Sequence, residues 1–378
     1  MPNISYKSKN ECCGCGACEN ICPKKCIDIV CDKEGFEYPK VNEQDCIDCG
    51  LCVRTCPWEG KTQTSPIKIY GLKAKDKELQ YKSSSGGAFL TIAHHLLNEG
   101  YVVFGATYTD DYSKVEHVKI ETCSDLNRLR GSKYVQSNLS DIFTQIKNLL
   151  NSGRKVAFSG TGCQVAALKL FLRNKDYDGL VTIDILCHGV PSPLLFKEFI
   201  KRVSGRYGKI LSMNMKDKTD GWGAQKIKVE AERPVPQSVL NLWSSIFYSR
   251  VALRPSCYEC KFMSLERSGD ISLGDFWGVE KVDKEFTDKA GVSLALFGTT
   301  KGLKIYETLS SHFEGIEVSG EECLQPVLVG PEKAPGWRMQ FWDTYYKFGF
   351  DEIAYRYWGI AFVNKLRLKI NRIIRRFY

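Results

Sequence analysis

The chain has 378 residues, which is longer than one typical domain, so we expect two or three folded units. Its 53 basic and 44 acidic residues give a formal net charge of +9, which favours acidic partners but does not set the fold. No run of about 18 or more apolar residues occurs, which argues against a transmembrane helix, and residues 1–11 lack the apolar core of a signal peptide. We therefore expect a cytoplasmic protein whose cysteines stay reduced.

Eleven of the seventeen cysteines lie between Cys12 and Cys56. Residues 12–23 and 46–57 both follow the spacing C-x2-C-x2-C-x3-C-P. Three thiolates on such a tight loop can bind one face of a 4Fe-4S cluster, while the fourth, followed by proline, points at the other cluster. The spacing thus predicts two clusters with crossed ligand sets. Cluster one takes Cys12, Cys15, Cys18 and Cys56, and cluster two takes Cys46, Cys49, Cys52 and Cys22.

A zinc ribbon and a disulfide knot are the alternatives for this region, but two identical runs of four cysteines do not have zinc-finger spacing. Residues 26–41, between the runs, read as a small hairpin. We interpret Cys13, Cys26 and Cys31, which fall outside both runs, as packing residues or as bystanders without a role of their own.

From residue 67 onward, strands alternate with amphipathic helices, which is typical of an α/β domain. The predicted strands are 101–108, 156–159, 180–186, 210–215, 225–231, 271–274 and 292–297. The predicted helices are 87–98, 138–151, 164–172, 193–203 and 301–310. The last fifty residues read as helical and rich in aromatic side chains.

Four further cysteines belong to this region. Cys163 follows a strand and a glycine turn at a predicted helix N-terminus, where a thiolate is favoured, and Cys187 follows the next strand. The exits of parallel strands share one edge of a sheet, so the two can lie close together. With Cys257 and Cys260 they make four ligands, enough for a third 4Fe-4S cluster. The spacing alone leaves a zinc site, a redox dithiol and plain core packing open.

The turn at residues 160–162 also matches half of a dinucleotide-binding fingerprint, with Asp184 one strand later. Val165 stands at the third glycine position, so the match is incomplete and is weak evidence for a nicotinamide site.

Six short runs occur together along the chain. They are SSSGG at 83–87, RGSKYVQS at 130–137, GTGCQ at 160–164, CHGVPS at 187–192, RPSCYEC at 254–260 and GDFWG at 274–278. In residues and order they resemble one family, the beta subunits of deazaflavin (coenzyme F-420) hydrogenases and dehydrogenases, over residues 1 to about 320. Gly162 departs from the family, whose members usually have proline there.

The resemblance implies an FAD-containing oxidoreductase domain supplied with electrons by the N-terminal clusters. It also implies that Cys163, Cys187, Cys257 and Cys260 bind the third cluster. Read locally, residues 85–87 form a helix N-cap turn and residues 130–136 a polar loop in which Arg130 and Lys133 can bind phosphate or the flavin ring. The FAD-binding residues that the resemblance implies are Ser84, Ser85, Gly86, Gly87, Arg130, Gly131, Ser132, Lys133, Tyr134, Gln136, Gly160 and Thr161.

The expected mechanism is an electron relay. A ferredoxin-like donor supplies single electrons, and the flavin collects two before hydride-type transfer to a small-molecule substrate that the sequence does not name. His188 is the candidate proton donor, and a structural loop histidine is the alternative. The rival function is an electron-transfer subunit that reduces a partner protein. Use of the deazaflavin coenzyme, and assembly into a homo-oligomer, stay open.

The end of the chain is a basic amphipathic segment that suits either an anionic membrane surface at the inner face or an acidic protein groove. A helix docked on the core is the alternative. Nucleic-acid binding is not expected, because the positive charge gathers in this tail and no recognition motif occurs. The basic residues are Lys365, Arg367, Lys369, Arg372, Arg375 and Arg376.

These observations predict an α+β multidomain protein. Residues 1–60 form a dicluster 4Fe-4S ferredoxin-like domain, residues 67–322 a mixed α/β flavin-binding domain, and residues 323–378 a helical segment with the basic tail.

Overall fold

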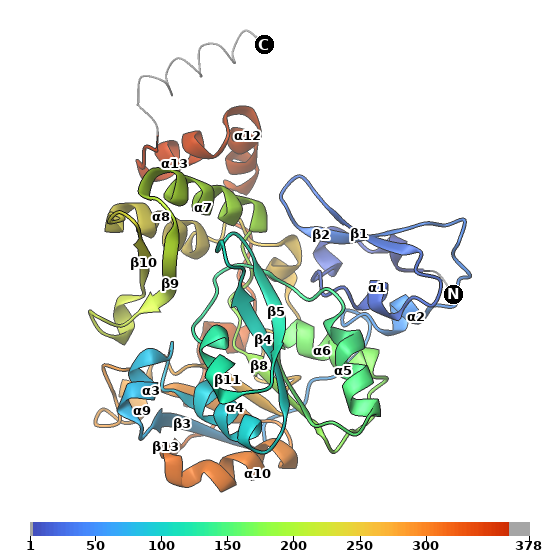
Figure 1. The fold of residues 1–378 in the computed structure, drawn as a ribbon, viewed down its shortest axis with the longest axis vertical. Helices are drawn as coiled ribbons and strands as arrows, with labels where there is room; N and C mark the ends of the chain where they lie inside the picture. The colour runs from blue at the N-terminus through green and yellow to red at the C-terminus, as the bar shows by residue number, and fades with distance from the viewer. Residues whose placement is uncertain (1–2, 363–378) are drawn as a thin grey trace.

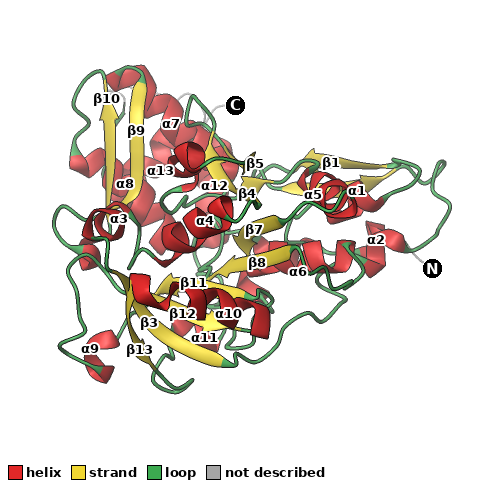
Figure 2. Ribbon diagram, turned by 60° about the horizontal axis from the view of Figure 1, so that its bottom comes forward, coloured by secondary structure: helices red, strands yellow, loops and turns green. Residues whose placement is uncertain are grey.

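The computed structural model describes residues 3–362 and contains one large mixed sheet. Its strands are β3 (Lys68–Ala74), β4 (Val102–Tyr108), β5 (Val115–Ile120), β6 (Ser137–Asn138), β7 (Val156–Thr161), β8 (Leu180–Ile185), β11 (Ile271–Asp275), β12 (Ser293–Phe297) and β13 (Phe313–Glu317). The strand order is β13-β3-β12-β11-β8-β7-β4-β5-β6, and β11, β8, β7 and β4 run parallel. Helices of the same region pack against the sheet (Figures 1 and 2). They are α3 (Lys77–Lys82), α4 (Ala88–Asn98), α5 (Ile142–Asn151), α6 (Gly162–Phe171), α9 (Val279–Val282), α10 (Thr300–Leu309) and α11 (Pro326–Val329).

The N-terminal part is a small unit beside the large sheet, drawn in blue in Figure 1. It contains α1 (Ala17–Ile21), α2 (Leu51–Arg54) and the antiparallel hairpin of β1 (Ile27–Cys31) and β2 (Glu37–Val41). The Asp32 carboxylate closes the hairpin by accepting hydrogen bonds from the amides of Glu34 and Phe36. The expected hairpin at residues 26–41 is therefore present.

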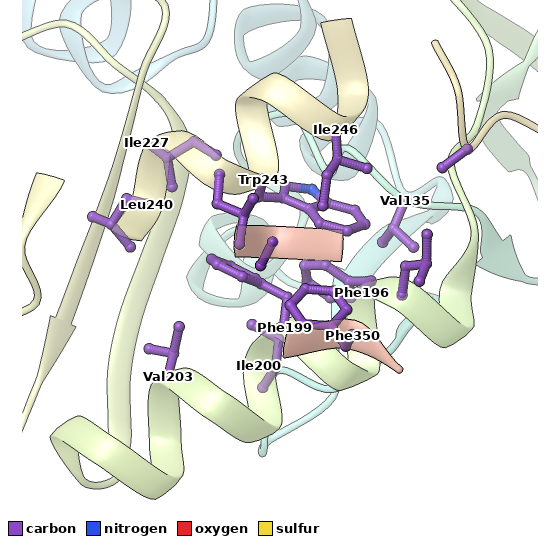
Figure 3. Packing of buried hydrophobic residues seen from close by; sticks show 14 of the residues in the cluster. Val135, Phe196, Phe199, Ile200, Val203, Ile227, Leu240, Trp243, Ile246 and Phe350 are labelled. Atoms are coloured by element: carbon purple, nitrogen blue, oxygen red, sulfur yellow. The ribbon is translucent and has the colours of Figure 1, made fainter. Parts of the chain in front are cut away.

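Another two-stranded sheet, besides the β1–β2 hairpin, lies apart from the large one. It pairs β9 (Ile210–Asp217) with β10 (Lys226–Ala231) and packs with α7 (Pro193–Tyr207), α8 (Gln237–Tyr248), α12 (Arg338–Phe348) and α13 (Phe350–Trp358). Figure 3 shows the apolar core that these elements share. Trp243 of α8 is fully buried there, with its ring centroid 5.0 Å from that of Phe196 of α7.

The predicted elements differ from the observed ones at identifiable places. The strands expected at 210–215 and 225–231 exist but form their own sheet. The helix expected from residue 138 begins at Ile142, because Ser140 has φ +44° and its amide donates to the Asn138 side chain. The strands β3, β5 and β13 and the helix α8 were not predicted.

No helix within residues 3–362 combines the length and the apolarity that crossing a bilayer requires. The basic tail residues all lie beyond residue 362, outside the described residues.

A buried ion pair ties the loop after Cys260 to β8. Arg267 Nη2 lies 2.7 Å from Asp184 Oδ1, and the two residues are 2% and 0% exposed. The amides of Ser268 and Gly269 donate to Asp184 Oδ2. Both carboxylate oxygens of Asp184 therefore bind Arg267 or backbone amides. They are not available to bind a ribose hydroxyl, which the dinucleotide-binding fingerprint would require of this residue.

We predict that Asp184→Asn destabilises the protein by about 3–5 kcal/mol, because it leaves the buried Arg267 guanidinium without its counter-charge. The measurement is the free energy of unfolding from urea denaturation. The control is Asp176→Asn at the exposed ion pair with Lys301, for which we expect a change below about 1 kcal/mol. Equal effects of the two substitutions would contradict this account.

Candidate functional site

The eight cysteines of the two N-terminal runs line two separate cavities. Cys12, Cys15, Cys18 and Cys56 line one of about 490 Å³, and Cys22, Cys46, Cys49 and Cys52 line one of about 20 Å³. Each cavity thus brings together three cysteines of one run and the fourth of the other, as the crossed sets require. Cys13 and Cys31 also line the first cavity and Cys26 the second, so the choice of four ligands in each still comes from the spacing. Within residues 3–362, no three His, Cys, Asp or Glu side chains have the geometry of a preformed metal site, so the assignment depends on these linings and on the spacing.

The four remaining candidate ligands meet at one edge of the large sheet. β7 and β8 are parallel neighbours, so Cys163, at the start of α6, and Cys187, just after β8, leave the sheet on the same side. Cys257 and Cys260 lie on the short helix η5 (Pro255–Glu259) and at its end. All four line a single cavity of about 440 Å³, which we call the large cavity after the large sheet that forms part of its wall, although the cavity of Cys12, Cys15, Cys18 and Cys56 has the slightly greater volume.

The local chemistry differs among these thiols. Burial raises the pKa of Cys187 to about 12, so its thiolate needs a compensating positive charge. Hydrogen bonds from Cys13 and Thr161 lower the pKa of Cys163 to about 7 in spite of its burial. Backbone amides donate to two of the sulfurs at 3.4 Å, Gly189 to Cys187 and Phe262 to Cys260. Such donors stabilise a metal-bound thiolate.

The loops that the family resemblance singled out line the same cavity. The Ser84 hydroxyl accepts a hydrogen bond from the Ser132 amide at 2.8 Å, so the 83–87 and 130–137 loops touch. Ten of the twelve expected FAD-binding residues line the cavity. They are Ser84, Ser85, Gly87, Gly131, Ser132, Lys133, Tyr134, Gln136, Gly160 and Thr161.

The other two expected residues, Gly86 and Arg130, are not among the lining residues. Arg130 is exposed to solvent. A side chain at Gly86 would place its Cβ 2.1 Å from the Leu72 carbonyl oxygen and 2.5 Å from the Ser293 nitrogen. Close packing between β3 and β12 is therefore sufficient reason for a glycine at position 86.

Burial lowers the pKa of two basic groups of the cavity. The Lys133 ammonium donates to the carbonyl oxygens of Leu129 and Arg130, and burial lowers the pKa of Lys133 to about 7. His188 lines the cavity, and burial lowers its pKa as well. At neutral pH His188 is therefore an uncharged imidazole.

Sequence reasoning missed an aromatic wall of this cavity. Phe247 stacks on Tyr134 with ring centroids 4.5 Å apart and planes 4° apart, and Tyr248 lies beside them. Trp277, from the GDFWG run, stacks on Trp222 at 4.3 Å. These contacts join residues that lie up to 114 positions apart in the chain. The runs at 130–137 and 274–278 contain Tyr134 and Trp277, but no local pattern pointed to their partner rings.

A buried ion pair adjoins the tryptophans. Lys216 Nζ pairs with Asp275 and lies 4.7 Å from the centre of the Trp277 ring, and the Lys216 side chain is 1% exposed. The Trp222 indole donates to Asp275 Oδ1 at 2.9 Å. Lys216, Asp275 and Trp277 all line the large cavity. They add a polar, aromatic region to the cavity, with Asp275 at the carboxyl end of β11.

Cys13, interpreted from the sequence as a packing residue, lies where two cavities meet. Among the described residues, it alone lines both the large cavity and the cavity of Cys12, Cys15, Cys18 and Cys56. Trp58 and Phe262 pack in the same apolar cluster, with their rings 6.2 Å apart. Cys13 is thus shared by the two cavities and packs against the cluster that contains Trp58 and Phe262.

Comparison with known protein families matches three parts of the chain. Residues 11–59 match the model of a 4Fe-4S dicluster domain. Residues 69–144 match the N-terminal part, and residues 153–318 the C terminus, of the coenzyme F420 hydrogenase/dehydrogenase beta subunit.

Two individual proteins are similar to the chain. One subunit of the F(420)H(2) dehydrogenase of Methanosarcina mazei is 28% identical over 205 residues, which are 49% of this chain and 56% of that protein, so the chain spans just over half the length of this curated relative. A chain in the structure of the F420-reducing [NiFe] hydrogenase complex from Methanosarcina barkeri aligns with 20% identity and a TM-score of 0.46, covering 79% of this chain and 93% of that one.

The two beta-subunit matches together cover more than half of the chain and follow one another in order. With the dicluster match before them, they show that this protein belongs to the family of coenzyme F420 hydrogenase/dehydrogenase beta subunits and carries a 4Fe-4S dicluster domain.

Proposed function

We propose that this protein is an iron-sulfur flavoprotein oxidoreductase that relays electrons from a ferredoxin-like donor to FAD and on to a substrate. The observation that carries the proposal is the shared lining of the large cavity. Four cysteines and the glycine- and serine-rich loops line it together, and Cys13 joins it to the first cysteine cavity. When bound, the clusters would carry single electrons and the flavin would pair them for a two-electron transfer.

Three sets of four cysteines would hold three 4Fe-4S clusters under this proposal. The first two are the crossed sets of the dicluster domain. The third set is Cys163, Cys187, Cys257 and Cys260, which a zinc ion could also use. The cavity of the third set adjoins the cavity of Cys12, Cys15, Cys18 and Cys56 through Cys13. Iron is favoured at the third set because an iron-sulfur cluster there could exchange electrons with the neighbouring cluster, which a zinc ion cannot do.

The residues of the large cavity fit a flavin. The stacked Tyr134 and Phe247 offer flat aromatic surface to a planar ring, and the Ser84 and Ser132 loops offer hydroxyl and amide groups to a pyrophosphate. Of the two basic residues in the 130–137 loop, Lys133 lines this cavity and Arg130 does not. The proposal therefore assigns the stabilisation of an anionic flavin to the protonated form of Lys133 and not to the exposed Arg130.

His188 would supply protons to the reaction. It follows Cys187 and lines the large cavity, and its neutral imidazole can donate one N–H proton and take up another. The structural alternative, a histidine that only shapes the loop, predicts no change in the pH dependence of turnover when His188 is replaced.

The alternative function is an electron-transfer subunit that reduces a partner protein. The name of the Methanosarcina mazei relative, which is part of a dehydrogenase with more than one kind of chain, favours this alternative. Turnover of a small molecule by the purified protein without any partner would favour the enzyme instead.

We predict that anaerobically purified, reconstituted protein contains about twelve irons, a matching amount of sulfide and about one FAD per chain, since each 4Fe-4S cluster holds four irons. The measurement is chemical analysis of iron, sulfide and flavin. About eight irons would remove the third cluster from the proposal. A lack of FAD would overturn the flavin relay.

We predict that Cys187→Ser removes about four irons per chain and leaves the dicluster domain loaded, because a serine oxygen is a poor replacement for the thiolate. Iron analysis and electron paramagnetic resonance of the reduced protein measure this. Cys31→Ser, at an exposed cysteine outside all three sets, is the control and should keep the full iron content. Unchanged iron in Cys187→Ser would show that Cys187 is not a ligand.

A further inference from the structure

His117 lies on the face of the large sheet that forms part of the cavity wall. It belongs to β5, where Val115, two residues earlier, also lines the large cavity. Ala106 on β4, the register partner of His117, and Ser159 on β7 line it too. The His117 ring is 6% exposed and stacks on Phe158 at 5.4 Å.

The hydrogen bond to β7 fixes which ring nitrogen of His117 carries the proton. Nε2 lies 2.9 Å from the Ser159 carbonyl oxygen. A carbonyl oxygen only accepts, so Nε2 must be the N–H donor, and Nδ1 of the neutral ring is then a bare acceptor. Burial lowers the pKa of His117 to about 4, which agrees with a neutral ring.

Nδ1 of His117 has no partner. Residues 3–362 contain seven buried side-chain nitrogen or oxygen atoms without a hydrogen bond, and two of these belong to residues that line the large cavity, His117 Nδ1 and Gln325 Oε1. The Gln325 amide donates to the Asp275 carbonyl, so its unpaired oxygen is also an acceptor. A buried acceptor without a donor costs about 1–3 kcal/mol. The cavity wall is therefore suited to a ligand that brings hydrogen-bond donors.

We propose that Nδ1 of His117 accepts a hydrogen bond from the ring N–H of a bound isoalloxazine and so orients the flavin in the large cavity. The inference rests on the proposed function, because it requires FAD in this cavity. The oxidised flavin ring carries its N–H at N3. Because the tautomer of His117 is fixed by the bond to Ser159, Nδ1 can only accept a hydrogen bond and so can recognise that N–H. His117 is in this sense a positioning residue, distinct from the loops at 83–87 and 130–137.

Two substitutions separate this role from a structural one. In His117→Asn the amide oxygen can take the place of Nδ1, so the acceptor is kept and the bond to Ser159 is lost. In His117→Gln the amide nitrogen can take the place of Nε2, so the bond to Ser159 is kept and the acceptor is lost. FAD binding to the cluster-reconstituted full chain is followed by flavin fluorescence quenching and by the flavin absorption spectrum.

We expect His117→Gln to raise the dissociation constant for FAD by about tenfold, because the flavin N–H is then buried without an acceptor, and we expect His117→Asn to stay within about threefold of the natural protein. Thermal unfolding and iron content check that both variants fold. Binding of FAD by His117→Gln as tight as that by His117→Asn would overturn the inference.

A second measurement uses the natural protein and does not depend on any variant folding. FAD is compared with its N3-methyl analogue, which lacks the ring N–H, and we expect the analogue to bind at least about tenfold more weakly. Equal binding of the two overturns the inference about His117. If FAD itself does not bind, the proposed function fails instead, so the two failures are distinguishable.

Discussion

The side chain of Arg254 holds the N-terminal unit against the rest of the protein. Arg254 is 0% exposed, and its guanidinium donates to the carbonyl oxygens of Cys12 and Glu37 at 2.6 and 2.7 Å and to the Gln136 side chain at 3.1 Å. It also lies over the Tyr38 ring, 4.3 Å from the centroid. A cation this deeply buried is tolerated only because its donors are used. Arg254 thus joins Cys12, of the first N-terminal ligand set, to the segment of the chain that carries Cys257, of the third set.

The same contact explains a glycine of the first cysteine run. Gly14 has φ +68°, and a Cβ there would lie 2.5 Å from Arg254 Nη1 and 2.6 Å from Gln136 Nε2. Further along the unit, the hairpin tip is held by an ion pair between Glu34 and Arg338 of α12. The N-terminal unit is therefore fixed at two separate points, and this keeps the first cysteine cavity next to the large cavity.

Local patterns predicted much of this arrangement. The cysteine spacing predicts the crossed division between the two N-terminal cavities, and the strand-turn-helix pattern around Cys163 predicts its place at the start of α6, because both depend on residues close together in the chain. Arg254 and His117 carry no such local pattern. The partners of Arg254 lie more than 100 residues away, and the unpaired Nδ1 of His117 depends on how β5, β4 and β7 align. Sequence periodicity contains no information on that alignment.

The proposed function also requires electron and proton transfer to be kept apart, and the distribution of side chains is suited to this. Apolar groups, Trp58, Ala166 and Phe262, pack around the cysteines where the two cavities meet. Such surroundings disfavour charge and exclude water, so they suit the transfer of an electron without a proton. His188, Lys133 and the ion pair of Lys216 with Asp275 line the large cavity instead. Under the proposed function, protons would therefore be exchanged in the large cavity, where the flavin and the substrate would need them.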